Sequence, residues 1–98
     1  MARHRIRWTR LALDDLRTAR DFVAADNRVA AAALVKRIRQ AVNRLATLPA
    51  SGRVVPERRA QGYREIIVAP FRIVYDAVDR DVHVLRVWHS RRNPADML

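Results

Sequence analysis

The sequence predicts an α+β domain in which a helical hairpin packs on one face of a small antiparallel sheet. Two observations support this fold class. Up to residue 48, apolar side chains recur every three to four positions, the period of amphipathic helices. After residues 49–52 the period changes to two, and the chain becomes rich in β-branched and aromatic residues, as strands are. The predicted order is β-α-α-β-β-β in a single domain over residues 1–98.

The first predicted elements are a short strand and a helix. Residues 4–9 alternate basic and apolar side chains, with Ile6 and Trp8 on one side. Thr9 is a suitable N-cap, and the apolar stripe that follows it runs through Leu16 and Val23. Residues 26–27 then end this helix and can cap the next, and two helices joined by so few residues must fold back as a hairpin.

The second helix is predicted over residues 28–48. Its apolar stripe includes Leu34, Ile38 and Leu45, while most basic residues lie off it. Residues 49–52, with Pro49 and Gly52, end the helical half. Residues 53–62 have no clear period and are predicted to form a loop.

Three strands are predicted in the second half, over residues 63–69, 71–78 and 82–89. Their separators are short enough only for tight antiparallel connections. The helices are expected to cover one sheet face and to leave the other to solvent or a partner. The predicted core comprises Ile6, Trp8, Leu16, Val23, Leu34, Ile38, Leu45, Ile73 and Leu85.

Composition and charge exclude several classes of protein. The 98 residues contain no Cys, which excludes disulfides, thiolate metal sites and a cysteine nucleophile. Twenty basic against ten acidic residues give a net charge of +10, which favours a polyanionic partner. The chain has no apolar run long enough for a membrane span and no apolar signal-peptide stretch. We therefore expect a cytoplasmic protein with no membrane role.

Four segments, in this order and spacing, resemble the RelE/ParE superfamily of bacterial toxins from type II toxin–antitoxin pairs. They are Trp8-Thr9 with Ala12, Asp15 and Leu16; Leu48-Pro49 followed by Gly52-Arg53; Tyr63-Arg64-Glu65-Ile66 with Phe71-Arg72-Ile73-Val74-Tyr75; and Val84-Leu85-Arg86-Val87 with His89-Ser90-Arg91-Arg92. The resemblance implies a toxin neutralised by a cognate antitoxin, which the positive charge predicts to be acidic. It also implies two alternative activities. RelE-like members cleave messenger RNA in the ribosomal A site, whereas ParE-like members poison DNA gyrase.

The nuclease alternative has definite chemical requirements. A metal-free RNase needs a base for the 2′-hydroxyl proton, a cation for the phosphorane and an acid for the leaving oxygen. The candidate catalytic residues are His89, Arg64, Arg72 and Arg91, with no metal and no cofactor. His89 has an intrinsic pKa near neutrality and lies beside a basic cluster. Strand alternation also places Leu85, Val87 and His89 on one face, so His89 is alternatively a structural residue bonded to a backbone carbonyl.

Comparison with RelE-like nucleases leaves this set incomplete. Arg64, Arg72 and Arg91 match basic positions of those enzymes, but the second basic position of the first meander strand falls on Ile66. No Tyr follows position 75 to stack on a nucleotide. The resemblance therefore favours a ParE-like gyrase inhibitor, with a target-binding set of Arg64, Arg72, Arg91 and Arg92.

Structural roles and a third function class also remain open. Arg72 projects from the face opposite Phe71, where pairing with Glu65 or Asp76 would explain it equally well. The third class is a basic nucleic-acid-binding module without toxicity, for which Phe71 and Tyr75 on one strand row would provide stacking rings. Ile73 between them and the expected helix cover disfavour that class.

Overall fold

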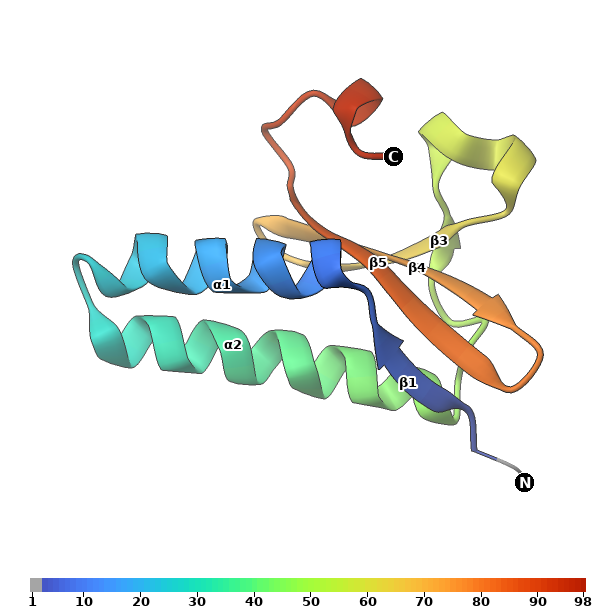
Figure 1. The fold of residues 1–98 in the computed structure, drawn as a ribbon, viewed down its shortest axis with the longest axis horizontal. Coiled ribbons are helices and arrows are strands. Elements are labelled where there is room, and N and C mark those ends of the chain that lie inside the picture. Colours follow the sequence, from blue (N-terminus) through green and yellow to red (C-terminus); the bar gives the residue numbers. More distant parts are fainter. Residues whose placement is uncertain (1–2) are drawn as a thin grey trace.

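A computed structural model describes residues 3–98 and confirms the α+β fold class (Figure 1). Thr9 caps the first helix as predicted, its Oγ1 accepting a hydrogen bond from the N–H of Ala12 at 3.2 Å. Asn27 caps the second helix in the same way through the N–H of Ala30. The elements in chain order are β1 (Arg5–Trp8), α1 (Arg10–Ala24), α2 (Arg28–Asn43), the 3₁₀ turn η1 (Arg44–Ala46), β2 (Arg53–Val54), η2 (Pro56–Gln61), β3 (Arg64–Val68), β4 (Phe71–Val78), β5 (Asp81–His89) and η3 (Pro94–Asp96).

The second helix is shorter than predicted, because α2 tightens into the 3₁₀ turn η1 after Asn43. Such turns are common at helix C-termini. This one places Leu45 in a buried cluster with Tyr75 and Val82. The apolar stripe therefore continues into η1 although the α-helix has ended.

The five strands form one sheet in the order β1-β5-β4-β3-β2. β3, β4 and β5 make the predicted antiparallel meander. The sheet as a whole is mixed, because β1 pairs in parallel with β5, with Ile6 opposite Val82. The helical hairpin provides the long crossover that a parallel pair of strands requires.

The predicted loop over residues 53–62 was wrong in part. Its beginning forms the short edge strand β2, in which Arg53 pairs with Glu65 and Val54 with Arg64. Its remainder forms η2, which ends at Gly62 in a left-handed conformation with φ of 70°. A two-residue strand is too short to show an alternation in the sequence.

The main core lies between the sheet and the helical hairpin, which covers one sheet face (Figure 1). Five predicted core residues are buried, and Ile6, Trp8 and Val23 are half-buried against the same core. The buried five are Leu16, Leu34, Ile38, Leu45 and Ile73. Leu85 was wrongly assigned to this core. A β-bulge pairs Val74 with Arg86 but Tyr75 with Val84, so Leu85 is the extra residue and packs on the other face.

The opposite sheet face is covered by the chain itself, which corrects the expectation that it is open to solvent or a partner. η2 and the C-terminal segment both lie on this side (Figure 1). Met97 is fully buried with Val55, Val74 and Trp88. Arg58 fastens the C-terminal segment by donating to the carbonyl of Leu98 at 2.8 Å.

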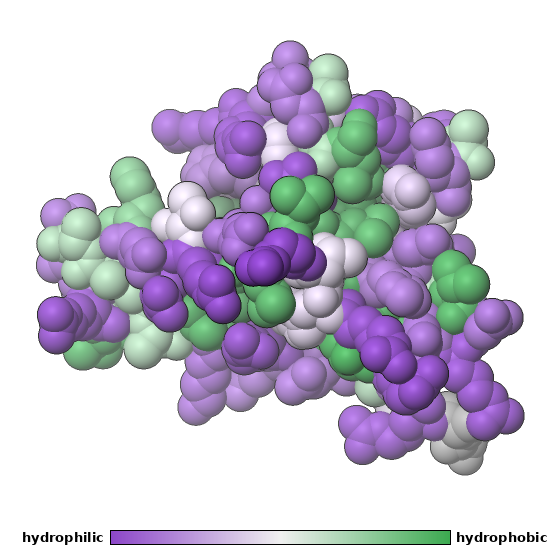
Figure 2. All heavy atoms as spheres, viewed as in Figure 1, coloured by the Kyte–Doolittle hydropathy of each residue, from purple (hydrophilic) through white to green (hydrophobic). Residues whose placement is uncertain are grey.

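The surface is mostly hydrophilic in the view of Figure 2, with scattered apolar patches. The most exposed large apolar side chains lie at the tip of the helical hairpin, where Phe22 is 82% and Val29 80% exposed. Within residues 3–98, no helix has both the length and the apolar character needed to cross a bilayer.

Candidate functional site

Three predicted site residues, His89, Arg91 and Arg92, lie together where β5 ends. The His89 ring packs edge-on against Phe71, with 5.3 Å between the ring centroids. Arg91 and Arg92 are exposed, and the Arg92 guanidinium lies 3.9 Å from the centroid of the Trp88 ring. The end of β5 is therefore a basic corner of the molecule that faces solvent.

The hydrogen bonding of His89 differs from the predicted structural role. The expected partner was a backbone carbonyl, but its Nδ1 accepts a hydrogen bond from the backbone N–H of Arg91 at 3.1 Å. The hydrogen of the neutral ring is then assigned to Nε2. Because a general base needs an unoccupied lone pair, this tautomer is poorly suited to remove a 2′-hydroxyl proton.

Arg72 lies in a network of ion pairs on the sheet face opposite the helices. Its Nη2 donates to Oε1 of Glu57 at 2.6 Å, and its Nε donates to Oε1 of Glu65 at 2.6 Å. Glu65 is fully buried and also accepts from Nε of Arg53 at 2.6 Å. The predicted Arg72–Glu65 pairing is present, so two carboxylates occupy the guanidinium.

The charges in this network stabilise one another. The hydrogen bonds that Arg72 donates to the Glu57 and Glu65 carboxylates raise its pKa above the usual value. The hydrogen bond from Arg72 lowers the pKa of Glu57 below its usual range. Glu57 comes from η2, so this ion pair holds η2 against the sheet.

Arg64 supports the turn that precedes β2. Its Nη1 donates to the carbonyl of Gly52 at 2.8 Å, while the hydroxyl of Tyr75 accepts from the N–H of Gly52 and donates to the carbonyl of Pro49. Burial raises the pKa of Tyr75. A Cβ at position 52 would lie 2.6 Å from the carbonyl oxygen of Glu65, which explains the requirement for glycine here.

Arg64 and Arg72 do not converge on one site. Arg64 pairs with Tyr75 across the β3–β4 ladder and belongs to the row that faces the helices. Arg72 belongs to the row on the opposite face, under η2. His89 pairs with Phe71 at the far end of β4 from Tyr75. The predicted catalytic residues are thus distributed over two faces and two ends of the sheet.

An apolar groove lies between the helical hairpin, the start of β4 and the end of β5. Its volume is about 560 Å³. Phe22, Leu34, Phe71 and Val87 provide apolar walls, and His89 is at its rim. His89 therefore borders a groove lined mainly by apolar side chains.

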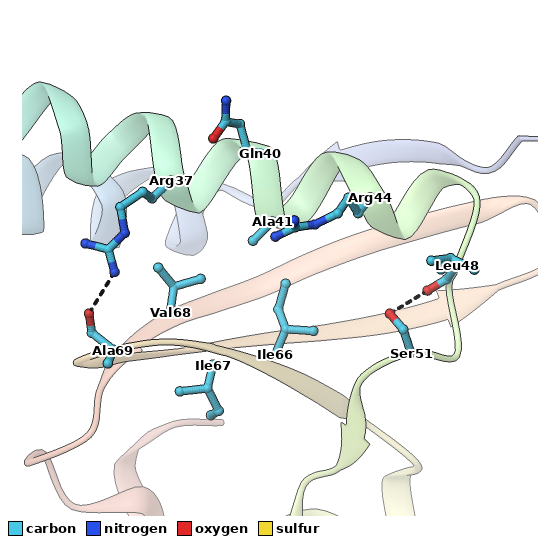
Figure 3. A pocket seen from close by; sticks show the side chains of 10 residues that line it. All are labelled: Arg37, Gln40, Ala41, Arg44, Leu48, Ser51, Ile66, Ile67, Val68 and Ala69. Carbon is cyan, nitrogen blue, oxygen red and sulfur yellow. Dashed lines mark hydrogen bonds between the residues drawn. The ribbon is translucent and has the colours of Figure 1, made fainter.

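A second groove, the β3 groove, lies between α2 and the edge of β3 and has a volume of about 510 Å³. In Figure 3, Arg37 reaches down from α2 towards Ala69, while Ile66 and Val68 point upward from β3. Arg37 reaches across one end and donates to the carbonyl of Ala69 at 3.3 Å. The complete lining is Arg37, Gln40, Ala41, Arg44, Leu48, Ser51, Ile66, Ile67, Val68 and Ala69.

Sequence reasoning missed the contact that joins α1 to β5. Asp15 accepts from Nε of Arg86 at 2.8 Å and from the backbone N–H of Val87 at 3.0 Å. Asp15 is spaced for the α1 face that meets the sheet, but a lone carboxylate on a helix carries no signal of its partner. In residues 3–98, no group of three or more His, Asp or Glu side chains is arranged to hold a metal ion.

A family model described as the ParE toxin of the type II toxin–antitoxin system parDE matches residues 6–94. The chain belongs to the ParE toxin family. It is 42% identical over 94 residues to "Putative toxin Y4kP" of Sinorhizobium fredii, covering 94% of each chain. It is 34% identical over 86 residues to "Toxin RelE2" of Caulobacter vibrioides, covering 87% of this chain and 93% of the relative.

The fold of the chain is also found in a solved structure. The structure titled "Chromosomal ParDE TA system from P. aeruginosa" superposes with a TM-score of 0.74 at 23% identity, covering 88% of this chain and 95% of that one. As a ParE family member, the chain is a toxin of a type II system, and the family implies an antitoxin partner.

Proposed function

We propose that this ParE family toxin acts in the cytoplasm by inhibiting DNA gyrase, and that a small acidic antitoxin neutralises it. The observation that supports this target is the position of Arg72, whose guanidinium is bound by Glu57 and Glu65 and has little exposed surface. A nuclease would need that cation at the scissile phosphate. Arg64 lies on the other sheet face and Nδ1 of His89 is occupied, so proton transfer has no assembled site.

Under this proposal, target contact falls to the exposed members of the predicted set. Arg91 and Arg92 present their guanidinium groups at the end of β5, next to the apolar groove. Arg64 and Arg72 support the fold from which this corner projects.

The RelE-like alternative, cleavage of ribosome-bound messenger RNA, rests on one specific observation. His89, Arg91 and Arg92 form a cluster containing a titratable ring and two cations.

The third function class, a nucleic-acid-binding module without toxicity, is not supported, because Phe71 and Tyr75 are both buried and offer no stacking surface.

The chain is expressed with and without the neighbouring reading frame, which is expected to encode the antitoxin. Parallel assays of supercoiling by gyrase and of cleavage of ribosome-bound message then separate the two activities. We expect the purified chain to block supercoiling by gyrase and to leave ribosome-bound message intact. The variant His89→Ala should remain toxic, because no proton passes through His89 in gyrase inhibition. Messenger RNA cuts at A-site codons that disappear in His89→Ala, with unchanged DNA supercoiling, would instead establish the nuclease. Such an acid–base loss would lower the rate by about 10²–10⁴-fold.

A further inference from the structure

Four exposed arginines follow one another across the surface from α2 to the end of β5. They are Arg44, Arg37, Arg92 and Arg91, and we call them the basic track. Arg37 and Arg44 both line the β3 groove, and Arg37 and Arg92 both line the apolar groove. Because the two grooves share Arg37, the four side chains form one series that links α2 to the basic corner.

The β3–β4 turn joins the two halves of the basic track. On one side, Nη2 of Arg37 donates to the carbonyl of Ala69 at 3.3 Å (Figure 3). On the other side, the backbone N–H of Ser90 donates to the carbonyl of Pro70 at 2.9 Å. The turn is therefore held between α2 and the residues that follow β5, so the fold itself fixes where the cations stand.

No carboxylate in the described part of the chain neutralises the basic track. The ion pairs found there involve none of its four arginines. The segments that carry or support the track, residues 27–56, 66–75 and 82–95, contain no Asp or Glu. Asp15 lines the apolar groove, but Nε of Arg86 donates to its carboxylate at 2.8 Å. The track therefore presents uncompensated positive charge to solvent.

The spacing of the track suits the phosphodiester backbone of duplex DNA. Arg37 and Arg44 are two helical turns apart, about 10 Å along the axis of α2. Each strand of a duplex carries one phosphate per about 3.4 Å of helix axis, so these two side chains span about three phosphate steps. Long, exposed side chains can meet so closely repeated a charge at any register, whereas a single carboxylate or phosphate would meet only one of them. Phosphate contacts need no stacking ring, so the burial of Phe71 and Tyr75 does not oppose them.

We propose that the basic track binds the phosphodiester backbone of duplex DNA without reading its base sequence. Each of the four guanidinium groups contacts a phosphate through charge-assisted hydrogen bonds and releases condensed counterions. In the cell this duplex is the one that gyrase holds, a setting that rests on the proposed function. The track then places the toxin on the DNA beside the enzyme.

The probe is a fluorescein-labelled DNA duplex, and its binding to the full chain without gyrase is followed by fluorescence anisotropy. A duplex of about 20 base pairs is titrated between about 50 and 200 mM salt, where counterion release controls affinity. Four phosphate contacts predict a slope of about −3.6 for the logarithm of the association constant against that of the salt concentration, a loss on the order of 100-fold over this range. A second duplex of different base composition should bind within about twofold, because phosphate contacts carry no sequence information.

Arg44→Ala with Arg91→Ala removes one cation from each end of the track. The slope should become less steep by about 1.8, and affinity at the lower salt concentration should fall by at least about tenfold, because two contacts are lost. Each substitution made singly should reduce the slope by about 0.9. Thermal unfolding of each variant establishes that folded chains are compared.

The control Arg59→Ala with Arg80→Ala makes the same change in net charge away from the track. Both side chains are exposed, Arg59 in η2 and Arg80 just before the start of β5. Its slope should stay within about 0.3 of the wild-type value, because no phosphate contact is lost. Its affinity should change by no more than about threefold, the remainder of long-range attraction.

Several outcomes would overturn the inference. Failure of the folded wild type to bind the duplex at the lower salt concentration would do so, and equal changes of slope in both double variants would reduce binding to net charge. A loss confined to Arg91→Ala, with Arg44→Ala unchanged, would mean that no track extends from the corner to α2.

The nature of the nucleic acid and the choice of target are tested by two further comparisons. An RNA of the same length that binds much more tightly than the DNA duplex, with the same response to the arginine substitutions, would identify RNA as the occupant and refute the assignment to DNA. A chain that inhibits gyrase without binding the duplex refutes this inference alone. A chain that binds the duplex along the track without inhibiting gyrase refutes the gyrase proposal alone.

Discussion

At the scale of single residues, Arg72 is expected to act through stability. Arg72→Met leaves the fully buried Glu65 carboxylate without its buried cation, retaining only the exposed Arg53. Breaking a buried ion pair by removing one partner costs about 3–5 kcal/mol. Urea unfolding at neutral pH should show a loss of this size.

Two matched variants give this prediction its controls. Arg91→Met changes the same charge at an exposed position and should alter the free energy of unfolding by less than about 0.5 kcal/mol. Adding Glu65→Leu to Arg72→Met removes the stranded carboxylate and should restore part of the stability. If Arg72→Met alone is as stable as the wild type, the network is not what holds η2 to the sheet.

The Glu57–Arg72 pair also predicts how stability depends on pH. The pKa of Glu57 is lowered in the folded chain by its hydrogen bond to Arg72, so below neutrality the unfolded chain binds more protons. The contribution of Glu57 is therefore complete above its unfolded pKa of about 4.3 and is lost as pH falls through the lower folded value. Glu57→Gln should flatten this part of the stability curve relative to wild type. If the free energies of unfolding of wild type and Glu57→Gln vary with pH in parallel, Glu57 does not carry this part of the pH dependence.

The sequence could indicate only part of the site at this scale. Arg72 and Glu65 fall on the same face of adjacent strands, so their pairing follows from alternation. Glu57 lies in a segment without a hydrophobic period, so no sequence pattern predicts that its carboxylate lies over Arg72. Alternation correctly places His89 with Val87, although the bulge turns Leu85, the third predicted member of that row, to the other face. Its bond to the N–H of Arg91 depends on the turn after β5, which side-chain periodicity does not describe.

At the scale of elements, Asp15 is the contact that fixes α1 to β5 beyond the end of β1. β1 pairs only with residues 81–84, so the N–H of Val87 has a helix carboxylate as its partner on that edge. Asp15→Ala leaves this N–H and the half-buried Arg86 guanidinium without that carboxylate, and should cost about 3–5 kcal/mol. Asp15→Asn keeps one acceptor oxygen, so its free energy of unfolding should lie between those of Asp15→Ala and the wild type.

Hydrogen exchange locates this effect. The amide of Val87 should lose more protection in Asp15→Ala than the global loss of stability explains, while amides in the centre of β4 should exchange faster only in proportion to that global loss. An Asp15→Ala chain with a protected Val87 amide and unchanged stability would mean that α1 is held by its apolar face alone.

The element order was predictable because each long segment carries its own period, and the exceptions have local causes. The bulge at Leu85 inserts one residue without altering composition, so the alternation of β5 changes face midway. β2 is too short to alternate. Met97 covers the second sheet face by packing on Val55 and Val74. No local sequence pattern predicts this contact, because Met97 is a single apolar residue far from both along the chain.

At the scale of the whole molecule, the two sheet faces have different consequences for binding. One is filled by the helical hairpin and the other by η2 and the C-terminal segment, so neither face of the meander is available as a flat binding platform. The surfaces left for partners are the basic corner at the end of β5 and the grooves beside the helices. The apolar groove beside the basic corner and the β3 groove share Arg37 and Ala69 in their linings, so these surfaces adjoin one another.

The net charge of +10 predicts that association with the proposed acidic antitoxin is steered electrostatically and depends strongly on salt. The radius of gyration is 13.2 Å, whereas the screening length is about 30 Å at 0.01 M salt and about 10 Å at 0.1 M. At the lower salt concentration the field of all the charges extends beyond the molecule, and at the higher one an approaching partner senses only local patches.

Stopped-flow association rates should therefore fall by at least about tenfold between these two salt concentrations, while dissociation rates change much less. Lys36→Glu with Arg39→Glu should reduce the association rate at low salt, because each substitution lowers the net charge by two. A rate independent of salt would show that short-range contacts alone control the encounter.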